Sequence, residues 1–201
     1  MINENIINIF QREINIIDQN VESKSNLIDE KIYSESISPY LQNRSPYRLN
    51  LLKEAPDIDT FNQIINEFST VLSVCNDIQL KLFIKLTRLQ DVKLFYESQI
   101  EEIKQIETKL VVRNYYSEKE KLYVKEMQSY SFEVNKEAIN DYFQYRYSYR
   151  YNLLVKGEFD SVVFQKINNM YNTIISDLKP DVLNQFINYL KLQDLFILTK
   201  H

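Results

Sequence analysis

The sequence predicts an all-α protein, an elongated helical bundle built on one long helix from about residue 59 to residue 113, with shorter antiparallel helices around it. The stretch from Asp57 to Lys156 contains neither glycine nor proline, the residues that turns require. The whole chain has 1 glycine and 4 prolines, which argues against β-rich and α/β folds. A seven-residue apolar repeat inside that stretch indicates the long helix.

The repeat consists of two series of positions, each with a spacing of seven residues. The first series is Phe61, Phe68, Cys75, Leu82, Leu89, Tyr96, Ile103 and Leu110, and the second is Ile64, Val71, Ile78, Lys85, Val92, Gln99 and Ile106. Side chains at these positions share one helix face, and this period favours partner helices that cross at a shallow angle. An unbroken helix would be roughly 80 Å long. We therefore expect it to project and to pair with another subunit; the alternative is a reversal at Asn76-Asp77.

Two segments precede the long helix. Residues 1–36 are expected to form amphipathic helices that pack on the bundle, or alternatively a docking arm. Residues 37–57 contain three prolines, which fix φ and disfavour helix in the residue before them, so we expect an extended arm or linker. Tyr40 and Tyr47 each follow a Ser-Pro pair, and their rings should lie against the chain's own bundle or against a neighbour.

The third segment, residues 58–201, is expected to form the helical bundle. The long helix should reverse near Arg113-Asn114, before a capping box at 117–120. Residues 128–151 are the ambiguous part: alternation of aromatic side chains favours a small β-hairpin, whereas a polar stripe with a spacing of four favours a helix. We favour the helix, with its end at Gly157. Two further helices should begin at Asp160 or Ser161 and at Pro180.

Several classes of chemistry lack their residues. The only histidine is His201, so serine–histidine and cysteine–histidine mechanisms have no base, and a Cys/His zinc site lacks ligands. Cys75 occupies a repeat position and is expected to pack in a core. Phosphate loops and dinucleotide fingerprints need more than one glycine. We therefore expect a protein that is not an enzyme, with no catalytic residues, no metal site and no cofactor.

The most unusual local composition is the run of tyrosines and arginines at 142–151. On a helix, Arg146 and Arg150 lie one turn apart, with Tyr145 and Tyr149 beside them. Such a surface could contact phosphate or nucleic acid by charge and stacking, or form the centre of a protein interface. The ordinary alternative is a core-facing helix whose arginines pair with acids such as Asp141, Glu133 or Glu137. The net charge of −4 disfavours nucleic acid.

These features favour a structural or assembly protein, a helical subunit packed in a larger complex. The abundant isoleucine, asparagine, lysine and tyrosine are typical of an AT-rich genome, so a phage or virus particle component, in the head or head-to-tail connector, is one setting. The alternatives are a nucleic-acid-binding accessory factor and a cellular coiled-coil adaptor. We expect partners to be other protein subunits, as a homo-oligomer or larger assembly. The candidate interface residues are Phe61, Phe68, Leu82, Leu89, Tyr96, Ile103, Tyr40 and Tyr47.

The sequence also predicts where the protein resides. No run of eighteen apolar residues is present, so no membrane span is expected. The first residues lack the basic and apolar segments of a signal peptide, and 1 cysteine does not allow an internal disulfide. We therefore expect an intracellular protein of the cytoplasm, or a virion component, that is not secreted by a signal peptide.

Overall fold

The computed structural model describes residues 2–53, 56–105, 112–133 and 135–200. Every regular element in these ranges is helical, which confirms the all-α class. Residues Ile106, Leu110 and His201, which entered the sequence predictions, lie outside the described ranges.

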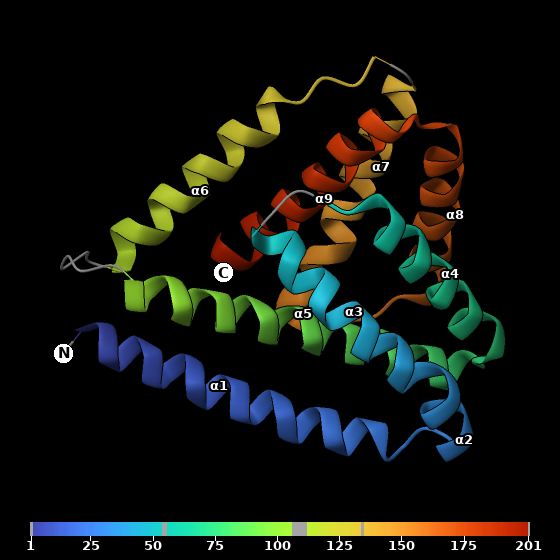
Figure 1. Ribbon diagram of the computed structural model, residues 1–201, viewed down its shortest axis with the longest axis horizontal. Coiled ribbons are helices and arrows are strands. Elements are labelled where there is room, and N and C mark those ends of the chain that lie inside the picture. The colour runs from blue at the N-terminus through green and yellow to red at the C-terminus, as the bar shows by residue number, and fades with distance from the viewer. Residues whose placement is uncertain (1, 54–55, 106–111, 134, 201) are drawn as a thin grey trace. The chain divides into compact units, whose positions relative to one another are not determined.

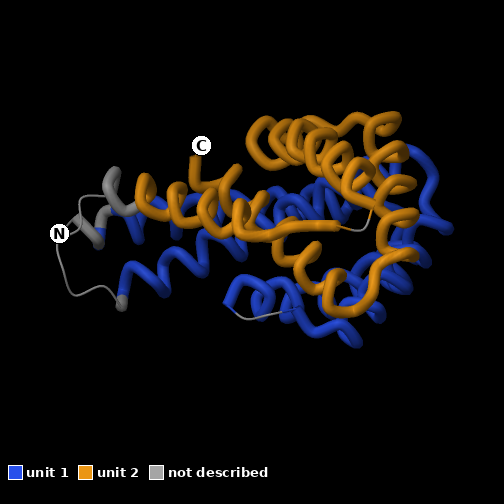
Figure 2. The backbone as a smooth tube through the Cα atoms, turned by 90° about the horizontal axis from the view of Figure 1, so that it is seen from above, with its two compact units in different colours: residues 1–111 blue, residues 112–201 orange. Residues whose placement is uncertain are grey.

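The chain divides into two compact units, residues 1–111 and residues 112–201 (Figure 2). This division differs from the predicted segments 1–36, 37–57 and 58–201. The predicted bundle segment is split, because α5 belongs to unit 1 and α6 to unit 2.

Unit 1 contains α1 (Ile2–Ser25), α2 (Glu30–Ile32), the π-helical stretch η1 (Tyr33–Ile37), α3 (Ser38–Lys53), α4 (Ile58–Val74) and α5 (Asp77–Gln105). Helix α1 lies antiparallel along α5 (Figure 1). Phe10 stacks on Tyr96 with ring centroids 5.1 Å apart, and Lys93 Nζ lies 2.6 Å from Asp18 Oδ1. Helix α3 packs against both α4 and α5, so the core of unit 1 lies between these helices.

Unit 2 contains α6 (Val112–Ser129), α7 (Lys136–Tyr151), the π-helical stretch η2 (Asn152–Lys156), α8 (Ser161–Asp177) and α9 (Pro180–Lys200). Helix α6 lies along α9, and α7 packs against both α8 and α9. In each unit the first long helix lies along the last, and the second long helix (α3 or α7) contacts the two long helices that follow it.

The two units also share sequence at equivalent positions. Residues 40–52 read YLQNRSPYRLNLL and residues 142–154 read YFQYRYSYRYNLL. Residues 57–71 read DIDTFNQIINEFSTV and residues 160–174 read DSVVFQKINNMYNTI, while LQD occurs at 89–91 and again at 192–194. The chain thus contains one helical arrangement twice, with α3, α4 and α5 corresponding to α7, α8 and α9.

Equivalent side chains make equivalent contacts in the two cores. In unit 1, the Tyr40 ring lies 5.8 Å from that of Phe68 and 5.4 Å from that of Phe83. In unit 2, the Tyr142 ring lies 6.0 Å from that of Tyr171 and 5.6 Å from that of Phe186. The remaining pairs of these triads also meet, Phe68 with Phe83 and Tyr171 with Phe186. Each triad joins the second, third and fourth long helices of its unit.

The prediction of one continuous helix over 59–113 is wrong. The helix breaks at Cys75 and Asn76, where Cys75 adopts extended backbone with ψ 131°. The Asn76 side chain accepts hydrogen bonds from the backbone N–H groups of Ile78 and Gln79, and the Gln79 side chain accepts one from the Asn76 N–H. This reciprocal capping box begins α5 without glycine. Both helices still face α3 across the break, because Phe68 of the repeat and Phe83, next to the repeat position Leu82, contact Tyr40 of α3.

The predicted extended arm at 37–57 is also wrong, because residues 38–53 form α3 with Pro46 in its interior. Burial of Tyr40, Tyr47 and Leu51 stabilises this helix against the cost of its proline. The π-helical stretch η1 ends at Ile37, two residues before Pro39. Wider turns there relieve the clash of a proline ring with the carbonyl four residues back.

Other local predictions are confirmed. Residues 136–151 are helical, so the β-hairpin alternative at 128–151 is excluded. The helical run ends at Gly157, whose φ of 69° lies in the left-handed region that glycine adopts without steric cost. The Asp160 side chain caps α8 by accepting hydrogen bonds from the N–H groups of Val162 and Val163, and Pro180 is the first residue of α9.

Candidate functional site

Arg146 and Arg150, the pair singled out in the sequence, point from α7 to α9. Arg146 Nη2 lies 3.0 Å from Asp194 Oδ1, and Arg150 Nη2 lies 2.8 Å from Asp194 Oδ2. Arg146 Nη1 also donates a hydrogen bond of 2.6 Å to Gln193 Oε1. Gln193 in turn donates one of 3.0 Å to the Phe143 carbonyl. We call Arg146, Arg150, Gln193 and Asp194 the unit 2 Arg–Asp cluster.

The acid in this cluster is not one of those that the sequence predicted. Asp141, Glu133 and Glu137 are exposed. Asp194 is instead 4% exposed and comes from a helix far along the chain. A carboxylate at this depth requires compensating charge, which the two arginines supply, while Gln193 accepts a further hydrogen bond from Arg146.

The tyrosines of the same segment divide between core and surface. Tyr142 and Tyr149 are buried, and burial raises the pKa of each to about 12. Tyr145 is 48% exposed, and Lys166 Nζ lies 3.7 Å from its ring centroid in a cation–π contact. Of the residues proposed to contact phosphate or nucleic acid, therefore, Arg146 and Tyr149 are buried, Arg150 is bound to Asp194, and Tyr145 reaches the surface.

Unit 1 holds a matching cluster, formed by Arg44 and Arg48 of α3 with Gln90 and Asp91 of α5. Arg44 Nη2 and Arg48 Nε lie 2.7 Å and 3.0 Å from Asp91 Oδ1. Arg44 Nη1 donates a hydrogen bond of 2.6 Å to Gln90 Oε1, and Gln90 donates one of 2.7 Å to the Leu41 carbonyl. Equivalent residues join equivalent helices in the two units, α3 to α5 in unit 1 and α7 to α9 in unit 2. Each cluster therefore fixes the packing of the second long helix of its unit on the fourth.

The candidate interface residues lie inside unit 1. Phe61, Leu89, Ile103, Tyr40 and Tyr47 are buried, and burial raises the pKa of Tyr47 to about 12. Phe68, Leu82 and Tyr96 are half-buried, and these side chains belong to helices α4 and α5, which pack within the unit. Most positions of the repeat thus contribute to the core of unit 1, where their side chains pack within the unit, whereas Ile78 is 72% exposed.

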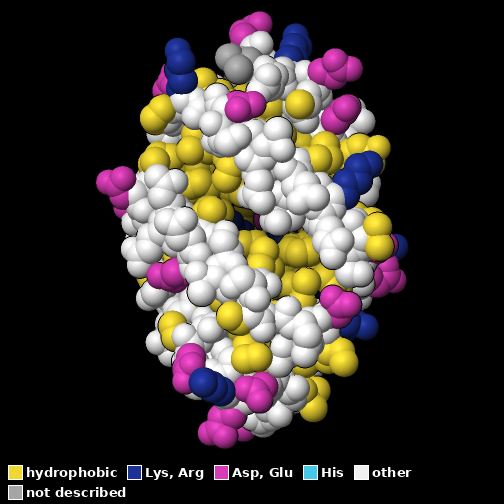
Figure 3. Space-filling view, turned by 90° about the vertical axis from the view of Figure 1, so that its right-hand side faces the viewer, with side chains coloured by type: hydrophobic (Ala, Val, Ile, Leu, Met, Phe, Trp, Pro, Cys, Tyr) yellow, Lys and Arg dark blue, Asp and Glu magenta, His cyan; other side chains and the backbone are white. Residues whose placement is uncertain are grey.

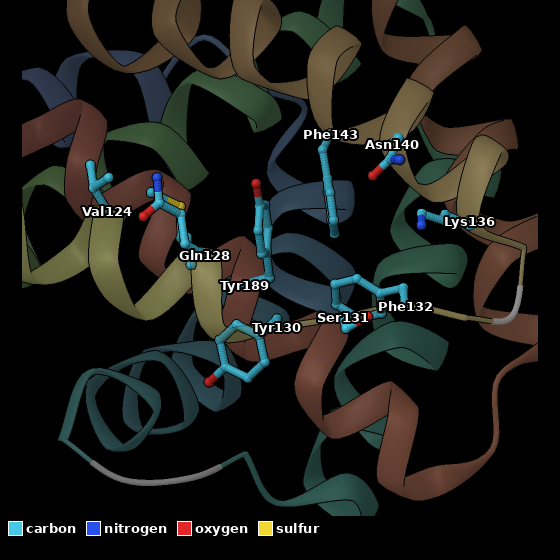
Figure 4. A pocket seen from close by; sticks show the side chains of 10 residues that line it. Val124, Gln128, Tyr130, Ser131, Phe132, Lys136, Asn140, Phe143 and Tyr189 are labelled. Atoms are coloured by element: carbon cyan, nitrogen blue, oxygen red, sulfur yellow. The ribbon is translucent and has the colours of Figure 1, made fainter.

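A pocket of about 500 Å³ opens in unit 2 between α6, α7, α9 and the segment that joins α6 to α7. Figure 4 shows Lys136 and Asn140 on one side of the Phe143 ring, and Gln128 beyond Tyr189 on the other. The residues that line it are Val124, Met127, Gln128, Tyr130, Ser131, Phe132, Lys136, Asn140, Phe143 and Tyr189. No pattern in the sequence indicated this pocket, because its lining comes from segments that only the fold brings together.

The remaining candidates for chemistry in the described part of the chain are the cysteine thiol and the side chains that could bind a metal ion. Cys75 is half-buried, and burial raises the pKa of its thiol, which makes it a poorer nucleophile. Within the described ranges, histidine, cysteine and acidic side chains do not gather in a group of three or more that could hold a metal ion.

Hydrophobic side chains reach the surface in several places, as Figure 3 shows for one face. The large ones that are exposed are Ile9, Ile16, Leu27, Val74, Ile78, Leu122, Tyr145 and Val162. None of the described helices combines the length and the apolar character needed to cross a bilayer.

Comparisons with protein-family models, with curated proteins and with solved structures gave no match.

Proposed function

We propose that this protein is a non-enzymatic helical subunit that assembles with further copies of itself. Its composition favours a phage or virus particle as the setting. The arginines that could have bound an outside ligand are used inside each unit to join helices. A protein whose polar chemistry holds its own helices together suits a structural role.

The observation that carries the proposal is the two-sided apolar character of α1. Ile14 and Ile17 are 5% and 7% exposed and face the core of unit 1. Ile9 and Ile16 are 51% and 43% exposed. They are separated by two helical turns and therefore share one outer face. A surface helix that packs on one side only is normally polar on the other, so isoleucines there favour a contact with another chain.

The nucleic-acid alternative has less support than the sequence alone gave it. Arg146 and Arg150 are both paired with Asp194, and the chain carries a net charge of −4. Binding to a single strand through this segment would have to depend on Tyr145 and nearby lysines, because its two arginines are engaged by Asp194.

Light scattering coupled to gel filtration tests the proposal, because a single chain has a mass of 24.2 kDa. We expect a mass of two or more chains that increases with concentration. The Ile9→Glu/Ile16→Glu variant should elute as a single chain. The matched control, Asn8→Glu/Asn15→Glu, adds the same charges to exposed positions of α1 and should behave as the unmodified protein. A mass of one chain for the unmodified protein at every concentration would contradict the proposal.

The particle setting has its own test in the genome of origin. Genes for packaging or tail proteins beside this one would support it, whereas neighbours of unrelated cellular function would count against it.

A further inference from the structure

We propose that the pocket of unit 2 binds a small aromatic molecule that carries one carboxylate group. At about 500 Å³, the pocket has the size of those that hold small ligands. Its lining combines an aromatic wall with polar groups at the mouth. The proposal does not depend on assembly, since all of the lining residues belong to unit 2.

Three of the four aromatic residues that line the pocket contact one another and form its wall. Phe143 stacks on Tyr189 with centroids 3.8 Å apart and planes inclined by 14°. Phe132 meets both rings edge-on, at 5.5 Å from Phe143 and 6.2 Å from Tyr189. Met127 also lines this space. Flat aromatic molecules pack well on such rings, and thioethers make favourable contacts with ring edges.

The mouth of the pocket provides a cation for an anionic group. Lys136 is exposed and makes no ion pair with any residue in the described ranges. Asn140 lies one turn further along α7, also exposed, with an amide that can donate hydrogen bonds in the same direction. An ammonium with a neighbouring amide donor is suited to a carboxylate, because hydrogen bonds between charged groups are the strong ones. Ser131 contributes less, since its hydroxyl bonds to Glu133 at 3.0 Å.

The second unit alone carries this combination of residues. The positions equivalent to Phe143 and Tyr189 hold Leu41 and Leu86 in unit 1, and the position equivalent to Lys136 holds Ser34. The shared core and the Arg–Asp clusters do not need these aromatic and basic side chains, because unit 1 forms both without them. Their presence in unit 2 is therefore explained better by a ligand than by the requirements of folding.

The test uses 2-naphthylacetate as the probe and the full chain as the protein. The chain has no tryptophan, so naphthalene fluorescence can be followed apart from that of tyrosine. We expect saturable binding, seen as an increase in the fluorescence anisotropy of the probe. The uncharged analogue 2-naphthylethanol should bind about tenfold more weakly, because it cannot form a charge-assisted hydrogen bond with Lys136.

Two variants locate the binding, each with a matched control. Lys136→Gln should weaken the binding of 2-naphthylacetate about tenfold, whereas Lys125→Gln, an exposed lysine of α6 outside the lining, should leave it unchanged. Asn140→Phe should block the mouth and abolish binding, whereas Gln144→Phe on the next turn of α7 should not. Circular dichroism checks that every variant is folded.

The result expected is therefore saturable binding that depends on the carboxylate, on Lys136 and on an open mouth. Absence of saturable binding to the unmodified chain would overturn the proposal. Equal affinity for the charged and uncharged probes, or unchanged affinity in Lys136→Gln or Asn140→Phe, would overturn it as well. None of these binding results changes the mass expected from light scattering, so the pocket and the assembly are tested independently.

Discussion

At the scale of single residues, Asp91 and Asp194 are the positions on which each unit depends. Each carboxylate is almost completely buried and accepts contacts from two arginines one helical turn apart. Removal of water from charges is costly, and only good geometry with further hydrogen bonds compensates for it. The glutamine before each aspartate provides such a bond by accepting from Arg44 or Arg146.

We therefore expect Asp194→Asn to destabilise unit 2 by about 3–5 kcal/mol, because it leaves the buried Arg146 and the part-buried Arg150 without a counter-charge. Asp91→Asn should have an effect of similar size on unit 1. Urea unfolding followed by circular dichroism measures both. Glu158→Gln, an exposed carboxyl in unit 2, is the matched control and should change little. Equal unfolding midpoints for Asp194→Asn and Glu158→Gln would show that the cluster does not stabilise the fold.

The buried tyrosines predict how stability depends on pH. Burial raises the pKa of Tyr47, Tyr142 and Tyr149 from 10.0 to about 12. Between these values the folded chain keeps protons that the unfolded chain has lost. Stability is therefore complete below about pH 10 and falls as the pH rises toward 12. Alkaline titration, with tyrosinate absorbance and circular dichroism recorded together, should show ionisation of these tyrosines coinciding with unfolding.

A variant separates this effect from general alkaline damage. Tyr149→Phe removes one of the three groups, so its free energy of unfolding should fall less steeply above pH 10 than that of the unmodified chain. Tyr145→Phe changes an exposed ring and should leave the slope unchanged. A common slope for the two variants would contradict this account.

At the scale of elements, the sequence predicted helices well where start and stop signals are local. Asp160, Gly157 and Pro180 act through their own backbone neighbours, and each marks a helix end as expected. One local signal was wrong, because the predicted reversal near Arg113-Asn114 and the capping box at 117–120 lie inside α6. Two further errors have opposite causes. The α4–α5 break was concealed by an apolar period that continues across it, whereas α3 was concealed by prolines whose cost is offset by distant contacts with α4 and α5.

Pro46 gives a test at this scale. It lies inside α3, where proline lacks an N–H and its ring presses on the preceding turn. Pro46→Ala should stabilise unit 1 by up to about 3 kcal/mol. The equivalent residue of α7 is Ser148, which keeps its N–H. Ser148→Ala is therefore the matched control, with an expected gain of about 0.5 kcal/mol. A loss of stability in Pro46→Ala, measured by thermal unfolding, would contradict this expectation.

At the scale of the whole molecule, the chain is one helical arrangement used twice. Shared residues occupy the interior in both units: Ile37 and Ile139, Phe83 and Phe186 are all 0% exposed. Exposed positions differ between the units, and the pocket is lined by residues that unit 1 does not repeat. The buried residues that the two units share are therefore those that folding requires. The exposed and pocket-lining residues that differ between the units are the ones that could give each unit a separate role.

Because unit 2 has its own core and its own Arg–Asp cluster, residues 112–201 expressed alone should fold. We expect a helical circular dichroism spectrum and a cooperative thermal transition, with modest stability because a small domain buries a smaller share of its surface. Asp194→Asn in this fragment should remove the transition. A spectrum typical of an unfolded chain for the unmodified fragment would contradict the expectation.

The sequence by itself determined the helical class, several helix ends and the importance of Arg146 and Arg150, because composition, capping and spacing act between residues close along the chain. The tertiary structure decided that most of the heptad series packs within unit 1, that Asp194 completes the arginine cluster, and that a pocket opens beside Phe143. These depend on contacts between residues far apart in sequence, where local pattern carries no information about which faces meet. The repeat of residues 40–52 at 142–154 is present in the sequence. Only the structure shows that equivalent side chains of the two copies make equivalent contacts.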